Sequence, residues 1–364
     1  MTRRARSNAT VEKPLVYNTR PEGCQETHPA HTRVRNFLQP AEFKPFFVSP
    51  SLTLLESEPY THLMTNRRVF LAASLVALAL LVRPGHLAAQ AIQRSLYVSV
   101  LNEAGEPVRG LGPSDFIVRE DDVAREVLNV VLADDPMHIA LLIDNSQAAS
   151  RHIPDIRQAL PAFIAALTPA GEGVKHDISI IAVGERPTIL IEYTTDRVTL
   201  QKGIDRLWSR PGGGAYLLDA IVEACQGLEK RGASRPVIVA VTIEGPDFSH
   251  RLHDQVLDPL RASGAALHVL SIGPPSAESS DEVRERDIVL DEGPRATGGR
   301  RDHLLSSMAL GGALTKLAEE LTHQYRVTYA RPQSLIPPRQ VTVASSTPGL
   351  KARGTLINAS PRTP

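Results

Sequence analysis

From Met137 onward, short apolar runs alternate with segments of helical spacing, and this alternation constrains the fold more than any other feature. The apolar runs are nearly unbroken, which is typical of strands covered on both faces. The alternation predicts an α/β fold: a doubly wound, mostly parallel sheet with helices on both faces. The expected strands are HIALLI (138–143), DISIIAV (177–183), RPVIVAVTI (235–243) and ALHVLSI (266–272), and the expected helices are 153–167, 196–208, 216–232 and 310–325.

A small β module is expected before this region, over residues 92–135. Apolar residues stand two apart at Leu96, Val98 and Val100, and polar turns separate them from later apolar runs. About 40 residues cannot bury much of a core alone, so the module should pack on the α/β region after it. The expected domains are therefore this module, an α/β domain over 136–330 and a C-terminal β tail over 331–364.

Residues 64–91 have the layout of a secretory signal peptide. Met64 precedes Arg67 and Arg68, the apolar run Val69–Val82 follows, and small residues end the segment. This run is shorter than the roughly 20 residues that a membrane-spanning helix needs, so no stable membrane anchor is expected after cleavage. The arginine pair also fits the twin-arginine export route, which remains open beside the general secretory route. We expect a secreted or periplasmic protein.

The stretch before this leader, residues 1–63, shows no sustained period of 2 or 3.6 and is rich in Pro, Arg, Thr and Glu. A signal peptide normally begins a chain. We therefore expect residues 1–63 to be either untranslated, with Met64 as the start, or a disordered extension, and we assign no function to them.

Charge and cysteine content exclude several classes of function. The chain carries 40 basic and 40 acidic side chains, so nothing in its balance predicts a nucleic-acid partner. Its two cysteines are Cys24 and Cys225, and only Cys225 lies in the expected mature protein. A structural disulfide or a cysteine zinc site is not expected, and Cys225 is interpreted as a small core residue.

The loop after the first strand of the α/β region carries Asp144 and Ser146, and ligands of such folds bind at the carboxyl ends of the strands. Residues 137–331 resemble a von Willebrand factor type A domain, whose metal-ion-dependent adhesion site begins with Asp-x-Ser-x-Ser. The wider chain, residues 95–357, resembles exported bacterial proteins with such domains. The further motifs that carry this resemblance are GEPVRGLGPSDFIVREDD, ATGGR, LAEELTHQYRVTYARP and GLKARGTLI.

The resemblance implies a divalent cation held by this Asp, both Ser, a Thr on a second loop and an Asp after a later strand. The matching positions are Asp144, Ser146, Ala148, Ala215 and Glu244, so two hydroxyl ligands are missing and one carboxylate is longer. Three protein oxygens with water could still hold Mg²⁺ weakly. The site is therefore degenerate, and no cofactor is expected unless Mg²⁺ or Mn²⁺ binds this reduced set.

Asp144 and Ser146 also have a purely structural interpretation, in which they cap the turn after the strand. His250 and His253, with Asp247 and Asp254 nearby, have a spacing that a metal could use, but a solvated loop is favoured because no third ligand has a fixed spacing. Trp208 is expected to end an amphipathic helix and to pack against it.

No nucleophile, base or acid set is recognisable, so the sequence favours binding over catalysis. We expect a protein-interaction module that binds a protein or peptide partner through the crevice above Asp144 and the loops around Gly212 and Asp247, without metal. Metal-dependent adhesion through Asp144, Ser146 and Glu244 is the first alternative. An enzyme with an unrecognised site is the second.

Overall fold

The computed structural model describes residues 91–276, 280–333, 336, 338 and 340–356. The leader predicted over residues 64–91 lies outside this range except for its last residue, and the stretch 1–63 lies wholly outside it. Within the described range, no helix is long and apolar enough to cross a membrane.

The larger sheet in this range has six strands in the order β10-β9-β8-β5-β6-β7. All neighbouring strands run parallel except β7, which is antiparallel to β6 at one edge. The central strands are almost fully buried, as their unbroken apolar runs predict. The strands are β5 (His138–Ile143), β6 (Asp177–Ala182), β7 (Thr188–Thr194), β8 (Pro236–Ile243), β9 (Ala266–Ile272) and β10 (Arg301–Leu304).

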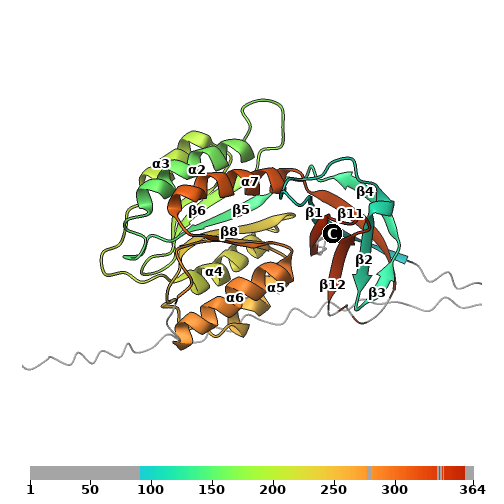
Figure 1. The fold of residues 1–364 in the computed structure, drawn as a ribbon. Helices are drawn as coiled ribbons and strands as arrows, with labels where there is room; N and C mark the ends of the chain where they lie inside the picture. The colour runs from blue at the N-terminus through green and yellow to red at the C-terminus, as the bar shows by residue number, and fades with distance from the viewer. Residues whose placement is uncertain (1–90, 277–279, 334–335, 337, 339, 357–364) are drawn as a thin grey trace, which may run out of the picture. The chain divides into compact units, whose positions relative to one another are not determined.

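Helices cover both faces of this sheet, so the predicted doubly wound α/β fold is confirmed. In Figure 1, α2, α3 and α7 lie above the sheet and α4, α5 and α6 below it. Each layer forms its own apolar cluster with the sheet. The helices are α2 (Ile153–Leu167), α3 (Arg197–Asp205), α4 (Leu217–Lys230), α5 (Asp254–Ser263), α6 (Asp281–Thr297) and α7 (Leu310–Thr322), with short 3-10 turns at Pro113–Asp115 and Ser307–Ala309.

A second core lies between two smaller sheets, ordered β13-β1-β11-β4 and β12-β2-β3 in the described chain. Tyr325, Val327 and Tyr329 pack there with apolar residues of β1 and β2, such as Leu96 and Phe116. The strands are β1 (Ala91–Leu101), β2 (Phe116–Glu120), β3 (Val123–Arg125), β4 (Val127–Leu132), β11 (Tyr325–Pro332), β12 (Val341–Ser345) and β13 (Lys351–Leu356).

Strands from both ends of the described chain therefore build one β sandwich. Strand β1 pairs with β11 on one side and with β13 on the other. The sequence interpretation assigned β1 to a separate module, most of β11 to the α/β domain and β13 to a C-terminal tail, because strand periodicity does not reveal which distant strands pair. The α/β region is thus inserted between the two halves of the sandwich.

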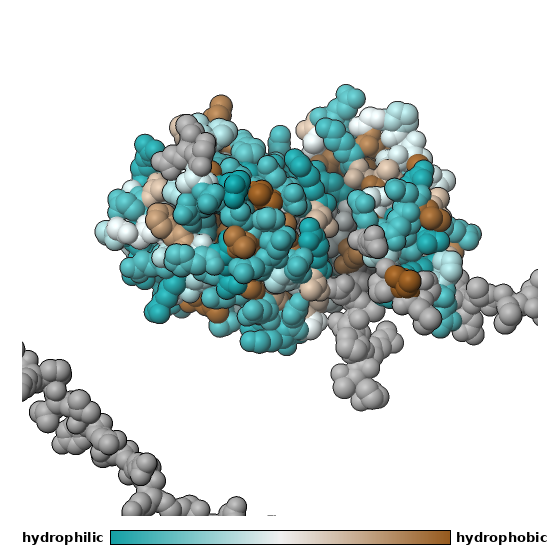
Figure 2. Space-filling view, turned by 90° about the horizontal axis from the view of Figure 1, so that it is seen from below, coloured by the Kyte–Doolittle hydropathy of each residue, from teal (hydrophilic) through white to brown (hydrophobic). Residues whose placement is uncertain are grey.

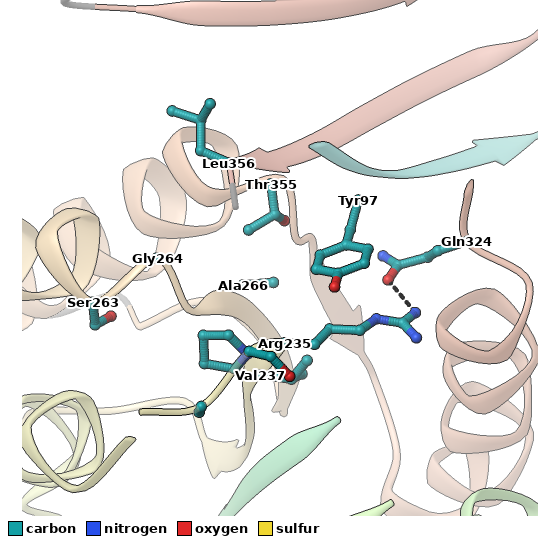
Figure 3. A pocket seen from close by; sticks show the side chains of 12 residues that line it. Tyr97, Arg235, Val237, Ser263, Gly264, Ala266, Gln324, Thr355 and Leu356 are labelled. Carbon is teal, nitrogen blue, oxygen red and sulfur yellow. Dashed lines mark hydrogen bonds between the residues drawn. The ribbon is translucent and has the colours of Figure 1, made fainter. Parts of the chain in front are cut away.

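Arg235, just before β8, joins the α/β region to the sandwich. Its guanidinium is buried, donates to the Leu321 carbonyl and the Gln324 Oε1 at 2.6 Å each, and lies 4.9 Å from the ring centroid of Tyr97. Figure 3 shows Tyr97, Arg235 and Gln324 side by side at the rim of a small cavity. The cavity, of about 20 Å³, has room for about one water molecule.

Candidate functional site

Asp144 lies at the carboxyl end of β5 and is 1% exposed. Its Oδ1 accepts a hydrogen bond from the Ser146 amide at 2.9 Å, and its Oδ2 accepts from the Ile243 amide at 3.1 Å. The Thr242 hydroxyl donates to the same Oδ2 at 3.3 Å. Both carboxylate oxygens therefore already bind the turn and the end of β8, as the structural interpretation of Asp144 and Ser146 expects.

Asn145 connects this turn to two other loops. Its Oδ1 accepts from the Gly184 amide at 2.7 Å, its Nδ2 donates to the Trp208 carbonyl at 2.9 Å, and its own carbonyl accepts from the Arg210 amide at 2.8 Å. A Cβ at position 184 would lie 2.7 Å from the Asn145 Oδ1, so the contact requires glycine there. One buried side chain thus fixes three loops into a continuous surface.

The loop after β8 is fixed by Asp247, which is 1% exposed. Its carboxylate accepts from the Leu217 amide at the start of α4 at 2.8 Å and from the Ser249 amide at 2.9 Å. Burial outweighs these hydrogen bonds and raises the pKa of the Asp247 carboxyl. Next to it, the Phe248 ring covers Gly214, where a Cβ would lie 2.2 Å from the ring. This loop is therefore held by helix α4 rather than free in solvent.

Glu244 follows β8 directly, and its side chain is 4% exposed. Arg286 of α6, itself 1% exposed, donates to the Glu244 Oε2 at 3.1 Å and to the Ile243 carbonyl at 2.9 Å. Arg301 of β10 donates to the Glu244 Oε1 at 3.0 Å. Arg286 also lies 3.4 Å from the hydroxyl of Thr242, which donates to Asp144. The carboxylate is thus held by two guanidinium groups.

The electrostatics of Glu244 follow from this arrangement. Burial by itself would raise the pKa of the carboxyl, but a hydrogen bond with Ser271 and the charges of Arg286 and Arg301 together outweigh burial. The pKa of Glu244 therefore lies below its ordinary value, and the side chain is ionised at neutral pH. Its charge is neutralised within the protein.

Large apolar side chains are exposed on the loops at this edge of the sheet. They come from the loop between α3 and α4, the loop between β8 and α5, and the connection from β10 to α7. Large apolar groups exposed together mark interaction surfaces more often than scattered single residues do. The exposed fractions are Trp208 66%, Phe248 51%, Leu252 59%, Leu305 85% and Met308 86%.

Comparison with known proteins agrees with this fold. The family model described as the von Willebrand factor type A domain matches residues 139–245, which run from β5 to the loop after β8. The chain contains a von Willebrand factor type A domain. No curated protein matches the chain.

Several solved structures are similar to the chain at low identity. Proximal thread matrix protein 1 of the mussel byssus is 12% identical with a TM-score of 0.42, covering 56% of this chain and 50% of its own. A von Willebrand factor type A protein of Catenulispora acidiphila is 11% identical with a TM-score of 0.43, covering 74% and 73%. The SpRpn10 VWA domain is 16% identical with a TM-score of 0.39, covering 51% and 94%. The match thus spans half the length of the mussel protein. Another structure of that protein has a metal-ion-dependent adhesion site (MIDAS) motif occupied by zinc.

Several residues at the metal positions of the family pattern differ in this chain. Ala148 and Ala215 supply no ligand oxygen, and both oxygens of Asp144 accept hydrogen bonds from the protein. The Glu244 carboxylate is paired with Arg286 and Arg301. In the part of the chain that the structure describes, no group of three or more His, Cys, Asp or Glu side chains could hold a metal ion.

The structure also shows where Cys225, His253 and Trp208 lie. Cys225 is buried in α4, as predicted. The Nδ1 of His253 lies 2.7 Å from the Glu285 Oε2 of α6. The prediction that Trp208 packs at a helix end is wrong, because α3 ends at Asp205 and the ring is mostly exposed.

Sequence reasoning missed two residues that organise the domain. Arg286 is one of several arginines in a polar helix, and nothing in the local pattern distinguishes the one that is buried. Asn145 stands between two candidate ligands in Asp144-Asn145-Ser146, a position that the family pattern leaves free. The contact of the Asn145 side chain requires glycine at position 184, and that glycine is the one hint of the contact in the sequence.

Proposed function

We propose that the chain is an interaction module that binds a protein or peptide partner at the carboxyl edge of its parallel sheet, without metal and without catalysis. The observation that carries this proposal is the set of exposed apolar side chains on the loops of this edge, among them Trp208, Phe248 and Leu252. Burying such groups against a partner is favourable by about 25 cal/mol per Å² before the costs of association. The loops are already fixed by buried side chains such as Asn145 and Asp247, which lowers the ordering cost of binding.

The face of the domain formed by helices α4, α5 and α6 differs from the loop edge in its exposed side chains. Seen from below the view of Figure 1, helices α4, α5 and α6 present mainly hydrophilic side chains with hydrophobic residues scattered singly (Figure 2). Single exposed apolar residues are normal on a soluble surface. The contrast supports the loop edge, rather than this helical face, as the binding surface.

The test is capture of partners from the envelope of the producing cell by the purified chain, with and without chelator. The double variant Phe248→Ser with Leu252→Ser is expected to lose the captured partner. Val123→Ser in β3 is the matched control, since that side chain is 54% exposed but lies in the sandwich. Equal loss in the control, or capture that chelator abolishes, would contradict the proposal.

A second measurement addresses metal independence directly. Bound ligand stabilises a fold by RT ln(1 + [L]/Kd), so ~1 mM Mg²⁺ at a site of millimolar affinity adds under about 0.5 kcal/mol. We therefore expect the same melting temperature in chelator and in millimolar Mg²⁺ or Mn²⁺. A large stabilisation that Asp144→Ala removes would favour metal-dependent adhesion instead.

A further inference from the structure

Arg235 is a buried cation that has no carboxylate partner in the described chain. The residue is 2% exposed, and no ion pair within the described residues includes its guanidinium. Its hydrogen bonds go to neutral acceptors, namely the Asp135 carbonyl at 3.2 Å, the Leu321 carbonyl at 2.6 Å and the Gln324 Oε1 at 2.6 Å. Burial lowers the pKa of the Arg235 guanidinium to about 10, which is still far above neutral pH, so the group stays charged. A buried charge without a counter-charge is unfavourable in a protein.

The carboxylates near Arg235 do not supply this counter-charge. The carboxylate of Asp135 acts on Arg235 only from beyond ion-pair distance, and its Oδ2 accepts from the Tyr97 hydroxyl and from Arg326, each at 2.9 Å. Asp134 lies 4.0 Å from Arg326, and its side chain is 80% exposed, so solvent screens its charge. The positive charge of Arg235 is therefore left without a partner among the described residues.

One donor of this guanidinium also lacks an acceptor. The Nε of Arg235 is buried and makes no hydrogen bond within the part of the chain that the structure describes. The neighbouring His176 leaves the charge balance unchanged, because burial lowers its pKa to about 4 and its ring is neutral at pH 7. A buried donor without an acceptor is costly, and more so on a charged group. The arrangement therefore calls for a negatively charged acceptor from outside the chain.

The cavity beside Arg235 has room for one small species. Its volume of about 20 Å³ corresponds to about one water molecule. Arg235 is the one charged residue among the described residues that line it, and the others, such as Gln324 and Thr355, are neutral (Figure 3). Ser234 and Leu356 belong to the lining and are exposed, so a solute can enter from solvent.

The lining favours a monatomic anion over a polyatomic one. Phosphate and sulfate carry four oxygens and bind where several donors converge. Here the Thr355 hydroxyl already donates to the Thr297 carbonyl at 2.6 Å, and the Ser263 hydroxyl donates to the Leu260 carbonyl at 2.8 Å. A halide is a single atom, so one charged donor and a small space suffice for it.

We propose that the cavity beside Arg235 binds a single chloride ion. The ion accepts a hydrogen bond from the guanidinium and supplies its counter-charge. Tyr97 of β1 and Thr355 of β13 line the site from the sandwich, and Ala266 of β9 lines it from the α/β region. Because the site needs residues of both regions, chloride binds the folded chain rather than the unfolded one and stabilises it by mass action. The site is separate from the loop edge of the proposed function, so either proposal can fail alone.

The first test compares urea unfolding in chloride and in gluconate at equal ionic strength. A site with a Kd of ~20 mM raises the folding equilibrium constant about 10-fold when ~200 mM gluconate is replaced by ~200 mM chloride. We therefore expect the unfolding midpoint to rise with chloride concentration and to level off as the site fills. Bromide, a slightly larger halide, is expected to act in the same way.

The second test locates the ion. Crystals of the unmodified chain grown in bromide are expected to show an anomalous scattering peak within hydrogen-bond distance of the Arg235 guanidinium. A cavity that holds only water gives no such peak. This measurement does not depend on whether any variant folds.

Two variants assign the chloride dependence to Arg235. Arg235→Gln removes the charge and the Nε donor, and its unfolding midpoint is expected to be the same in chloride and in gluconate. Arg331→Gln is the matched control, since Arg331 is 7% exposed but its Nε lies 3.4 Å from the Glu120 Oε2. This control should lose stability and keep the full response to chloride.

Two results would overturn the proposal: no bromide peak beside Arg235 in the unmodified chain, or an equal response to chloride in Arg235→Gln and in the unmodified chain. The second result would show that chloride acts through general salt effects rather than through this site. If Arg235→Gln does not fold, the bromide crystals decide the question alone.

Discussion

Replacing Arg286 by leucine tests whether the buried guanidinium holds the loop edge of the domain together. The change removes the donor to the Glu244 carboxylate and to the Ile243 carbonyl. Leucine leaves an apolar group of smaller volume beside a carboxylate that is 4% exposed. The structure therefore predicts a large loss of stability from this one substitution.

The magnitude follows from the burial of both partners. Removing one member of a buried ion pair costs about 3–5 kcal/mol, because the other charge is left without compensation. Arg301 still donates to Glu244 at 3.0 Å, which places the expected loss of unfolding free energy near ~3 kcal/mol. The double variant Glu244→Gln with Arg286→Leu removes the uncompensated charge and should lose less than Arg286→Leu alone.

The effect has a defined pH dependence. In the unmodified protein the lowered pKa of Glu244 contributes stability above the ordinary carboxyl pKa, and this contribution is lost as pH falls through the lower folded value. Without Arg286, one of the charges that oppose the effect of burial is lost, so the pKa of Glu244 is expected to rise. The loss of unfolding free energy caused by Arg286→Leu is therefore expected to shrink as pH falls below about 5, where the Glu244 carboxyl becomes protonated.

Urea unfolding followed by circular dichroism at neutral and acidic pH measures these differences. Arg284→Leu is the matched control on the same helix, since its side chain is 65% exposed and its ion partner Asp281 is 82% exposed. The control should change stability by under about 1 kcal/mol. A loss below about 1 kcal/mol for Arg286→Leu, or a loss that does not depend on pH, would refute the reasoning.

Three further predictions concern other parts of the chain. Val241→Asp, at a position of β8 that is 0% exposed, should cost several kcal/mol by burying an unpaired charge, and an unchanged melting temperature would contradict it. Burial lowers the pKa of His176 to about 4, so the stability from its neutral ring should decline as pH falls from about 6.5 towards 4, and His176→Gln should flatten that decline in urea titrations. Mass spectrometry of exported protein should find a new N-terminus near Gln90 or Ile92, and peptides from residues 1–63 in the mature protein would refute the leader assignment.

Strands β5, β6, β8 and β9 and helices α2, α3, α4 and α7 were predictable because burial leaves a direct trace in the sequence, whereas β7, β10, α5 and α6 were not predicted. Strand β8 reads PVIVAVTI, and helix α2 has the bounds that its apolar spacing indicates. The departure from the family's metal pattern was also visible, since the side chains of Ala148 and Ala215 carry no oxygen. These features depend on single residues or on local periods, which one sequence contains.

Pairings between distant residues were not predictable in the same way. The position of Arg286 against Glu244 depends on how α6 packs beside β8, and the exposure of Trp208 depends on where α3 ends. Helix α6 is so polar that its buried residues give no clear apolar stripe. Tertiary packing, rather than local preference, decides these contacts.

The closure of the sandwich by both chain ends has a consequence for the order of folding. Ala91 pairs with Pro332, and Leu101 pairs with Lys351, so β1 has no partner until the last strands have been synthesised. The strands of the α/β region succeed one another along the chain, and its contacts are the more local ones. Closing so long a loop is unfavourable unless the intervening domain has already formed and brought its ends together. We therefore expect the sandwich to assemble last, and a chain truncated before β11 to expose the unpaired edges of β1 and β4 to aggregation.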